Sequence, residues 1–147
     1  MSKFEVLIQR LDMDLPLPKY AKYGDAGVDI YSRIDCSLEP GERALIPTGI
    51  SIAFPEGYVC LVHPRSGLAV KNGISIVNAP GTIDAGYRGE VQVILINTDT
   101  KDAFELKRGD RIAQLVFQKV EIAEFKVVDE LPNSDRGASG FGSTGMQ

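Results

Sequence analysis

Short apolar segments, separated by glycine and proline, make up most of the chain. In Gly49–Phe54 the side chains of Ile50, Ile52 and Phe54 alternate with smaller ones, which is the period of a strand with one buried face. The stretch Val91–Asn97 is apolar on both faces and is predicted to be a central strand. The same signals predict further strands at Phe4–Arg10, Tyr58–Val62 and Ile74–Val77.

The stretch Ile112–Val128 is ambiguous between a helix and strands. It lacks a clean helical stripe, and its β-branched residues with broken alternation favour two strands joined by a bulge or bend. One short helix is expected at Ser66–Lys71, before the turn signal Asn72-Gly73. Because the strands follow one another without helices of roughly 10–15 residues between them, the fold class is all-β, a sandwich or a barrel.

Size and charge narrow the class of protein. The chain has 147 residues, about one domain, and its 44% hydrophobic and 24% charged residues are typical of a globular protein. The balance of 16 Lys and Arg against 20 Asp and Glu gives a net charge of −4, which argues against a general binder of nucleic acid or of membrane surfaces. The sequence shows neither an apolar run of membrane-spanning length nor a signal-peptide core, so we expect a cytoplasmic protein.

Cysteine and histidine are too few for several kinds of chemistry. Cys36 and Cys60 are expected to be buried free thiols in a reducing compartment, with a disulfide as the alternative. His63 is the only histidine, so a multi-histidine metal site is excluded and a structural role is favoured for it.

The composition changes at residue 132. This divides the chain into a β domain at 1–131 and a glycine-rich tail at 132–147, which is expected to be flexible. The pattern G-x-G-x-x-G at Gly140–Gly145 does not indicate a Rossmann site, because no predicted strand precedes it and no helix follows it.

The tail nevertheless suits a nucleotide. Its glycines expose backbone N–H groups, Ser143 and Thr144 add hydroxyls, and Arg136 adds a guanidinium, all of which can bind phosphate. Phe141 offers a face on which a base could stack. The alternative is a disordered tail.

Two shorter segments could bind an anion or a metal ion. Arg65 and Ser66 stand where a strand ends and a helix begins, which favours an anion, although a helix cap plus a surface arginine explains them as well. Asp25 and Asp29 could hold a hydrated Mg²⁺, which takes few protein ligands, although Asp25 also fits a local turn.

The densest segment runs from Asn78 to Glu90. Gly81, Gly86 and Gly89 around Asp84 indicate a hairpin with unusual backbone and close approaches. Asp84 could then be a general base near a ligand, and the alternative is a turn that its own carboxylate caps.

Taken in order, five segments of the chain resemble the five motifs of the homotrimeric dUTPase family, the dUTP nucleotidohydrolases. The match extends from about residue 4 to residue 145, without a departure at a motif position. The motifs are Ala26-Gly-Val-Asp-Ile30, Pro64-Arg-Ser-Gly-Leu-Ala69, Gly81-Thr-Ile-Asp-Ala-Gly-Tyr-Arg-Gly89, Arg111-Ile-Ala-Gln-Leu115 and Arg136-Gly-Ala-Ser-Gly-Phe-Gly-Ser-Thr-Gly145.

The resemblance implies a jelly-roll-like β fold of the β-clip type and a homotrimer with three active sites shared between subunits. The implied reaction is dUTP plus water giving dUMP and diphosphate, with Mg²⁺. Asp84 would activate the water as the catalytic base, and Asp29 would contact the Mg²⁺ through its waters.

The resemblance also implies substrate-binding residues. Tyr87 would lie under the deoxyribose, and Phe141 would stack on uracil as the tail closes over the site. The uracil edge would be read by Asn78, Thr82, Ile83 and Gln92. The α and β phosphates would be bound by Arg65, Ser66, Gly67 and Gln114, and the γ phosphate by Arg136, Gly142, Ser143 and Thr144.

Two rival functions follow from the same resemblance. A dCTP deaminase or a bifunctional deaminase–dUTPase would carry a glutamate after the hairpin, whereas the strand after Glu90 has no acidic residue before Asp99. A non-catalytic nucleotide-binding trimer would be expected to lack Asp84 or the tail motif, and both are present. Hydrolysis of dUTP is therefore the favoured function.

Overall fold

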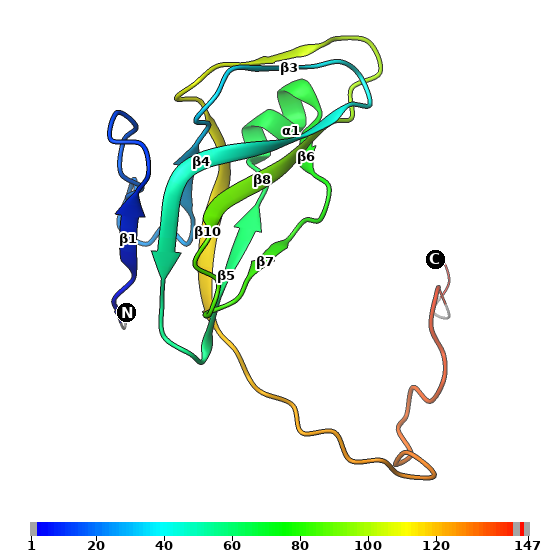
Figure 1. Ribbon diagram of the computed structural model, residues 1–147. Helices are drawn as coiled ribbons and strands as arrows, with labels where there is room; N and C mark the ends of the chain where they lie inside the picture. The colour runs from blue at the N-terminus through cyan, green and yellow to red at the C-terminus, as the bar shows by residue number, and fades with distance from the viewer. Residues whose placement is uncertain (1–2, 143–144, 146–147) are drawn as a thin grey trace.

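The computed structural model describes residues 3–142 and 145. Ten strands and one helix follow one another along this part of the chain (Figure 1). They are β1 (Leu7–Arg10), β2 (Val28–Tyr31), β3 (Cys36–Leu38), β4 (Arg43–Ala53), β5 (Tyr58–His63), α1 (Ser66–Asn72), β6 (Ile74–Ile76), β7 (Gly81–Ile83), β8 (Glu90–Asn97), β9 (Phe104–Leu106) and β10 (Arg111–Lys119).

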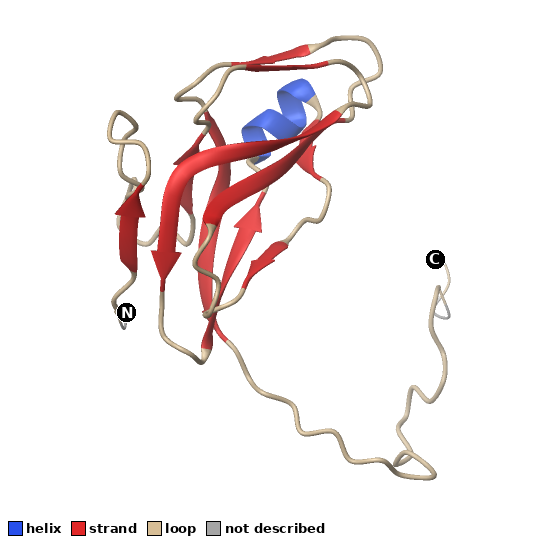
Figure 2. Cartoon of the chain, viewed as in Figure 1, coloured by secondary structure: helices blue, strands red, loops and turns tan. Residues whose placement is uncertain are grey.

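Two four-stranded sheets enclose the core. One has the strand order β1-β4-β8-β6 and the other β2-β10-β5-β7, while β3 and β9 form a separate two-stranded ribbon, with all pairs antiparallel. The sheets face each other and α1 lies at one end of them (Figure 2). The side chains of Ile46, Val93 and Leu95 from the first sheet, and of Ile30 and Cys60 from the second, are at most 1% exposed. The all-β class with one short helix is therefore confirmed.

Most predicted elements are present with small differences at their ends. The predicted helix extends by one residue to Asn72, and Gly73 ends it with a left-handed φ of 66°. The strand predicted at Gly49–Phe54 is the second half of the longer β4. The strand predicted from Phe4 begins only at Leu7, because the Phe4 ring leaves the sheet and stacks on Tyr58 with 4.2 Å between ring centroids.

The second strand predicted within Ile112–Val128 is wrong. The strand β10 ends at Lys119, and its bulge lies near its start, between Arg111 and Ala113. Residues 120–131, here called the arm, then lead away from the sheets (Figure 1). A strand needs a neighbour for its backbone groups, and within residues 3–142 no sheet edge pairs with the arm. Its apolar residues stay in solvent: Ile122 is 86%, Phe125 92% and Val127 96% exposed.

The two cysteines differ in their surroundings, and both thiols are free. Cys60 is fully buried, and this burial raises the pKa of its thiol to about 12. Cys36 is only half-buried, so the prediction of two buried thiols holds for Cys60 alone. Among the described residues, no helix combines the length and the apolar character that crossing a bilayer requires.

Candidate active site

Three predicted phosphate-side and metal-side residues meet on the outer face of the second sheet. In the register of β10, Gln114 is opposite both Asp29 on β2 and His63 on β5. Both Arg65 Nε, at 3.1 Å, and Gln114 Nε2, at 3.3 Å, donate hydrogen bonds to Asp29 Oδ1. Gly27 makes room for this cluster, because a Cβ there would lie 2.8 Å from Gln114 Oε1.

Among the described residues, the backbone N–H groups in the first turn of α1 donate to no capping side chain. Arg65 is the N-cap residue and has extended backbone, and no side chain caps the helix. The alternative in which Ser66 caps the helix is therefore wrong, since Ser66 is the first helical residue. Ser66 and Gly67 are exposed, and the space where a Gly67 Cβ would stand is open. Backbone N–H groups in a first turn without a cap can bind an anion.

A pocket of about 130 Å³ brings the predicted base-reading residues together. It lies beside β7 and β8 and has apolar walls that include Val62 and Ile76. The predicted hairpin is wrong, because β7 pairs with β5 in one sheet and β8 pairs with β4 and β6 in the other; residues 84–89 form a loop between the sheets, here called the β7–β8 loop. Apolar walls with a few convergent amide and hydroxyl groups are typical of small-ligand pockets. The predicted residues that line it are Asn78, Thr82, Ile83 and Gln92.

Asp84 and Tyr87 lie in the β7–β8 loop. Asp84 is exposed, and its carbonyl accepts a hydrogen bond from the Tyr87 N–H at 3.1 Å. The Tyr87 hydroxyl donates to the Glu90 carbonyl at 2.8 Å, which turns the phenol back over Gly89. A Cβ on Gly89 would be 2.5 Å from the Tyr87 hydroxyl oxygen, so the predicted close approach occurs here.

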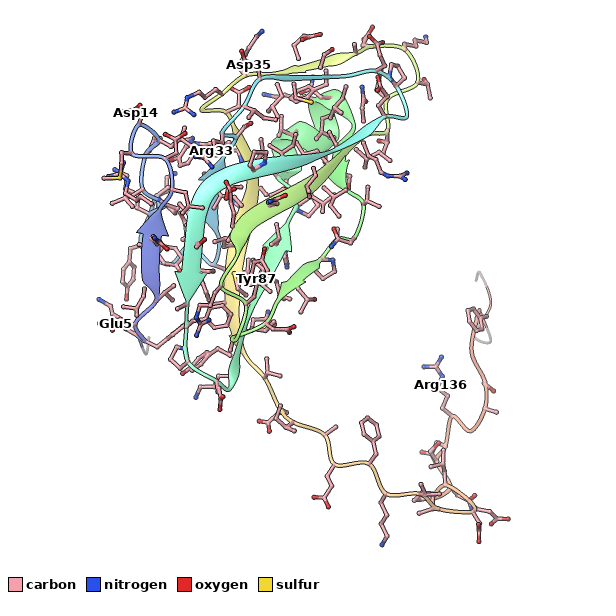
Figure 3. The ribbon with its side chains drawn as sticks, in the orientation of Figure 1. Glu5, Asp14, Arg33, Asp35, Tyr87 and Arg136 are labelled. Carbon is pink, nitrogen blue, oxygen red and sulfur yellow. The ribbon has the colours of Figure 1, made fainter. Side chains whose placement is uncertain are left out.

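The predicted tail residues are far from both groups. Arg136 lies on the tail well away from Tyr87 (Figure 3), and its Nε donates to the Ser139 carbonyl at 2.7 Å. Phe141 is fully exposed, with a left-handed φ of 46°, and Gly142 is exposed as well. Ser143 and Thr144 lie outside the described residues.

The site is thus in separate parts in this single chain. In the part of the chain that the structure describes, no hydrogen bond or ion pair joins Asp84, Tyr87 or the base pocket to the cluster around Asp29. Sequence reasoning also missed Arg111, whose Nε is 3.8 Å from Asp29 Oδ2. Its position three residues before Gln114, across the β10 bulge, was the available signal.

The carboxylate of Asp29 suits a metal ion whose other ligands are waters and substrate phosphates. Among the described residues, no three His, Cys, Asp or Glu side chains gather. Asp29 offers one carboxylate, and two of its neighbours are guanidinium groups. Mg²⁺ usually keeps several waters and is held by one or two carboxylates plus substrate phosphates, so this set fits an outer-sphere contact and not a protein cage.

The sequence model of the dUTPase family matches residues 13–145. The chain belongs to the dUTPase family. Among curated members, the deoxyuridine 5'-triphosphate nucleotidohydrolase of Thermobifida fusca is 62% identical over 140 residues, which are 95% of this chain and 78% of that protein. The protein of the same name from Corynebacterium glutamicum is 59% identical, over 95% of this chain and 94% of that protein.

Solved dUTPase structures have the same fold. The Staphylococcus bacteriophage 80alpha dUTPase with dUPNHPP superimposes with a TM-score of 0.89 at 32% identity, over 97% of this chain and 99% of that chain. A mutant dUTPase of the S. aureus phage phi11, described with a structural Mg(II) ion, has a TM-score of 0.79 at 30% identity, over 88% of this chain and 99% of that chain.

Proposed function

We propose that this protein hydrolyses dUTP to dUMP and diphosphate. The observation that carries the proposal is the base pocket, which is followed along the chain by a loop that presents an exposed carboxylate, Asp84, and an aromatic ring held by a hydrogen bond, Tyr87. Family membership supports the choice of substrate, because the curated relatives are named deoxyuridine 5'-triphosphate nucleotidohydrolases.

The base pocket would select uracil. The amides of Asn78 and Gln92 and the backbone at Thr82 and Ile83 can match the donors and acceptors of the uracil edge. Cytosine presents the opposite group at its position 4 and would leave a buried polar group unpaired, which costs roughly 10⁴-fold in such sites. A thymine methyl would be excluded by the small volume of the pocket. Tyr87 would pack under the sugar and exclude a 2′-hydroxyl.

Asp84 would act as the general base. In the proposed step, a water attacks the α-phosphorus and forms the new P–O bond of dUMP while the bond to the diphosphate breaks. The water's proton passes to the Asp84 carboxylate, a transfer that contributes typically 10²–10⁴-fold. The exposure of Asp84 in the β7–β8 loop gives water access to it before the site closes.

The cluster around Asp29 would bind the phosphates. Arg65 would donate to the α and β phosphates together with Ser66, Gly67 and Gln114, and Arg111 adds a second guanidinium to this side. Asp29 would hold Mg²⁺ through bound waters. When bound, Mg²⁺ neutralises charge on the triphosphate and on the leaving diphosphate.

We also propose that the active protein is a homotrimer with shared sites. Several features support this: the separate parts of the site, the exposed apolar arm, and a hollow of about 570 Å³ beside β1. Phe4, Ile8, Tyr20 and Tyr23 line this hollow. In such an assembly the β7–β8 loop of one subunit would face the Asp29 cluster of a second. The tail of a third closes over them, with Arg136, Gly142, Ser143 and Thr144 on the γ phosphate and Phe141 on uracil.

The deciding experiment measures diphosphate and ammonia release from dUTP, dCTP, dTTP and UTP, with and without Mg²⁺. We expect Mg²⁺-dependent release of diphosphate from dUTP alone, and a loss of about 10²–10⁴-fold in kcat for Asp84→Asn. Asp102→Asn, an exposed carboxylate after β8, is the matched control and should hydrolyse dUTP normally.

Other outcomes would favour the rival functions. Ammonia from dCTP would indicate a deaminase. Tight dUTP binding without turnover would indicate a nucleotide-binding protein. Normal hydrolysis by Asp84→Asn would contradict the role of Asp84. Light scattering tests the assembly, because a fully active monomer of about 16.0 kDa would contradict shared sites.

A further inference from the structure

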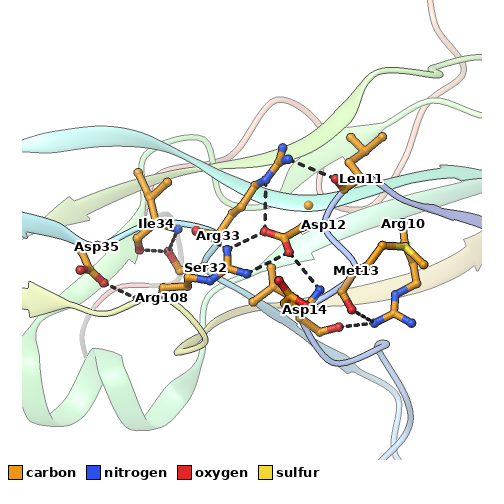
Figure 4. Close-up of polar contacts among 12 residues, drawn as sticks. Arg10, Leu11, Asp12, Met13, Asp14, Ser32, Arg33, Ile34, Asp35 and Arg108 are labelled. Carbon is orange, nitrogen blue, oxygen red and sulfur yellow. Dashed lines mark hydrogen bonds and ion pairs between the residues drawn. The ribbon is translucent and has the colours of Figure 1, made fainter.

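A network of charged side chains ends at Glu90, the residue that follows the β7–β8 loop. Arg108 binds Asp12 through both terminal nitrogens, and Arg33 Nε is 3.4 Å from Asp12 Oδ2 (Figure 4). Arg33 then reaches in the other direction, where its Nη1 is 3.3 Å from Glu90 Oε2. The network therefore joins the N-terminal segment and the turn after β9 to the first residue of β8.

Glu90 is the residue through which this network contacts the β7–β8 loop. Its carboxylate accepts a hydrogen bond from the Gly49 N–H at 2.8 Å as well as from Arg33. Its carbonyl accepts the bond from the Tyr87 hydroxyl. One residue thus fixes the phenol ring through its backbone and is itself fixed through its side chain, which is only 17% exposed.

The partner groups of Glu90 are themselves held. Gly49 lies where the pairing of β4 with β8 shifts register, and it has a left-handed φ of 77°. Its carbonyl accepts the N–H groups of Leu11 and Asp12, and a Cβ on it would be 2.9 Å from the Asp12 Cβ. The Arg33 N–H donates to the Pro47 carbonyl at 2.9 Å. Glu90 is therefore bound to a crowded part of β4, in which both the N–H and the carbonyl of Gly49 have hydrogen-bond partners.

We infer that Glu90, held by Arg33 and Gly49, is a positioning residue that sets how tightly Tyr87 fits the sugar and thus how well the enzyme rejects ribonucleotides. Because the Tyr87 hydroxyl is used by the Glu90 carbonyl, Tyr87 offers the site a fixed ring and not a free donor. Glu90 also stands two residues before Gln92 on the same face of β8, so the same anchor sets the depth of the base pocket. This inference rests on the proposed function.

The first test compares kcat/KM for dUTP and for UTP in Glu90→Ala and Glu90→Gln. We expect the ratio of kcat/KM for dUTP to kcat/KM for UTP to fall about tenfold in Glu90→Ala. This is less than the roughly 10²-fold loss of activity that a 1 Å misplacement causes. Glu90→Gln keeps an acceptor for the Gly49 N–H and should narrow the preference by about threefold. A merely destabilised protein loses both activities in proportion to its folded fraction, which leaves their ratio unchanged.

A second test needs no activity. Hydrogen–deuterium exchange of residues 84–89 in the ligand-free protein should be faster in both Glu90 variants than in the wild type. Glu105→Gln is the matched control, because Glu105 accepts a hydrogen bond from Ser37 on the distant β3–β9 ribbon and its loss should change neither readout.

The outcomes separate this inference from the proposed function. An unchanged dUTP-to-UTP ratio together with unchanged exchange at residues 84–89 would overturn the positioning role. If the wild type does not hydrolyse dUTP, the proposed function fails, and the exchange experiment alone then decides whether Glu90 holds the β7–β8 loop.

Discussion

The base pocket and the tail differ in what surrounds their side chains. Thr82 and Ile83 lie on β7, which pairs with β5, and Gln92 lies on β8 between β4 and β6. Arg136 and Phe141, in contrast, make no hydrogen bond or ring contact with the β domain in the described part of the chain. One part of the candidate site is shaped before any ligand arrives, and the other is not.

This difference has an energetic consequence. Sheet pairing has already fixed the backbone of the pocket, so a base that enters it gains contacts at little ordering cost. In the proposed closed state, ordering the tail would cost about 1–2 kcal/mol of backbone entropy per residue. The pocket is therefore suited to recognition, and under the proposed function the tail would close only over a complete triphosphate.

The largest expected effect comes from removing residues 132–147. We expect kcat/KM for dUTP to fall by at least about 10²-fold, because the γ-phosphate and base contacts of the tail are lost and water enters the site. Binding of dUMP, measured by calorimetry, should weaken far less, because the pocket remains. A truncated chain that hydrolyses dUTP at the normal rate would contradict the role of the tail.

A single ring in the tail should have the next largest effect. Stacking on an aromatic ring is worth about 1–3 kcal/mol per base, so Phe141→Ala should reduce kcat/KM for dUTP by about tenfold. Phe141→Trp keeps a stacking face and serves as the control. Equal losses in both variants would show that the ring does not act by stacking.

One polar group of the pocket should matter less. Asn78→Ala removes a single hydrogen-bonding group, typically worth 0.5–1.5 kcal/mol, and should raise KM for dUTP about fivefold. Steady-state kinetics checks this, with Asn133→Ala in the tail as the matched amide control. An equal rise of KM in Asn133→Ala would contradict a specific contribution of Asn78 to binding the base.

The smallest expected effect is a change in the pH dependence of the thermal stability of the β domain. The Arg108 guanidinium bound to Asp12 keeps the pKa of that carboxyl well below its usual range. The stabilisation is present above the ordinary pKa of an aspartate, about 3.9, and is lost as the pH falls toward the lowered value. Asp12→Asn should therefore lower Tm by a few degrees at pH 7 and by less at pH 3, measured by thermal unfolding. An equal shift at both pH values would contradict an ionic contribution.

How much the sequence predicts depends on the distance over which each contact is made. Alternation and turn residues predict β5, β6, β8 and α1 to within a residue, since those signals are local. The ribbon of β3 and β9 has three residues in each strand, too few to show a period. The motif resemblance supplied the pocket residues, which the structure brings together.

Other features have no local signal at all. Arg33 and Glu90 are 57 residues apart, and only the folded sheets bring them together. Residues 120–128 carry β-branched residues with broken alternation, and this composition does not show whether a sheet edge is available to pair with them. The second strand predicted within Ile112–Val128 is therefore wrong, and β10 ends at Lys119.

In the proposed trimer, the arm also makes the turnover per chain depend on the protein concentration. At roughly 3.3–3.6 Å per residue, the stretch 120–131 can span about 40 Å. Within an assembly, a tether of this length would hold the tail at the site that it closes at an effective concentration in the millimolar range, independent of the total protein concentration. In the proposed trimer the tail serves a neighbour, and that advantage lasts only while the subunits stay associated. Turnover per chain would then be constant in concentrated solution and fall steeply once dilution separates the subunits.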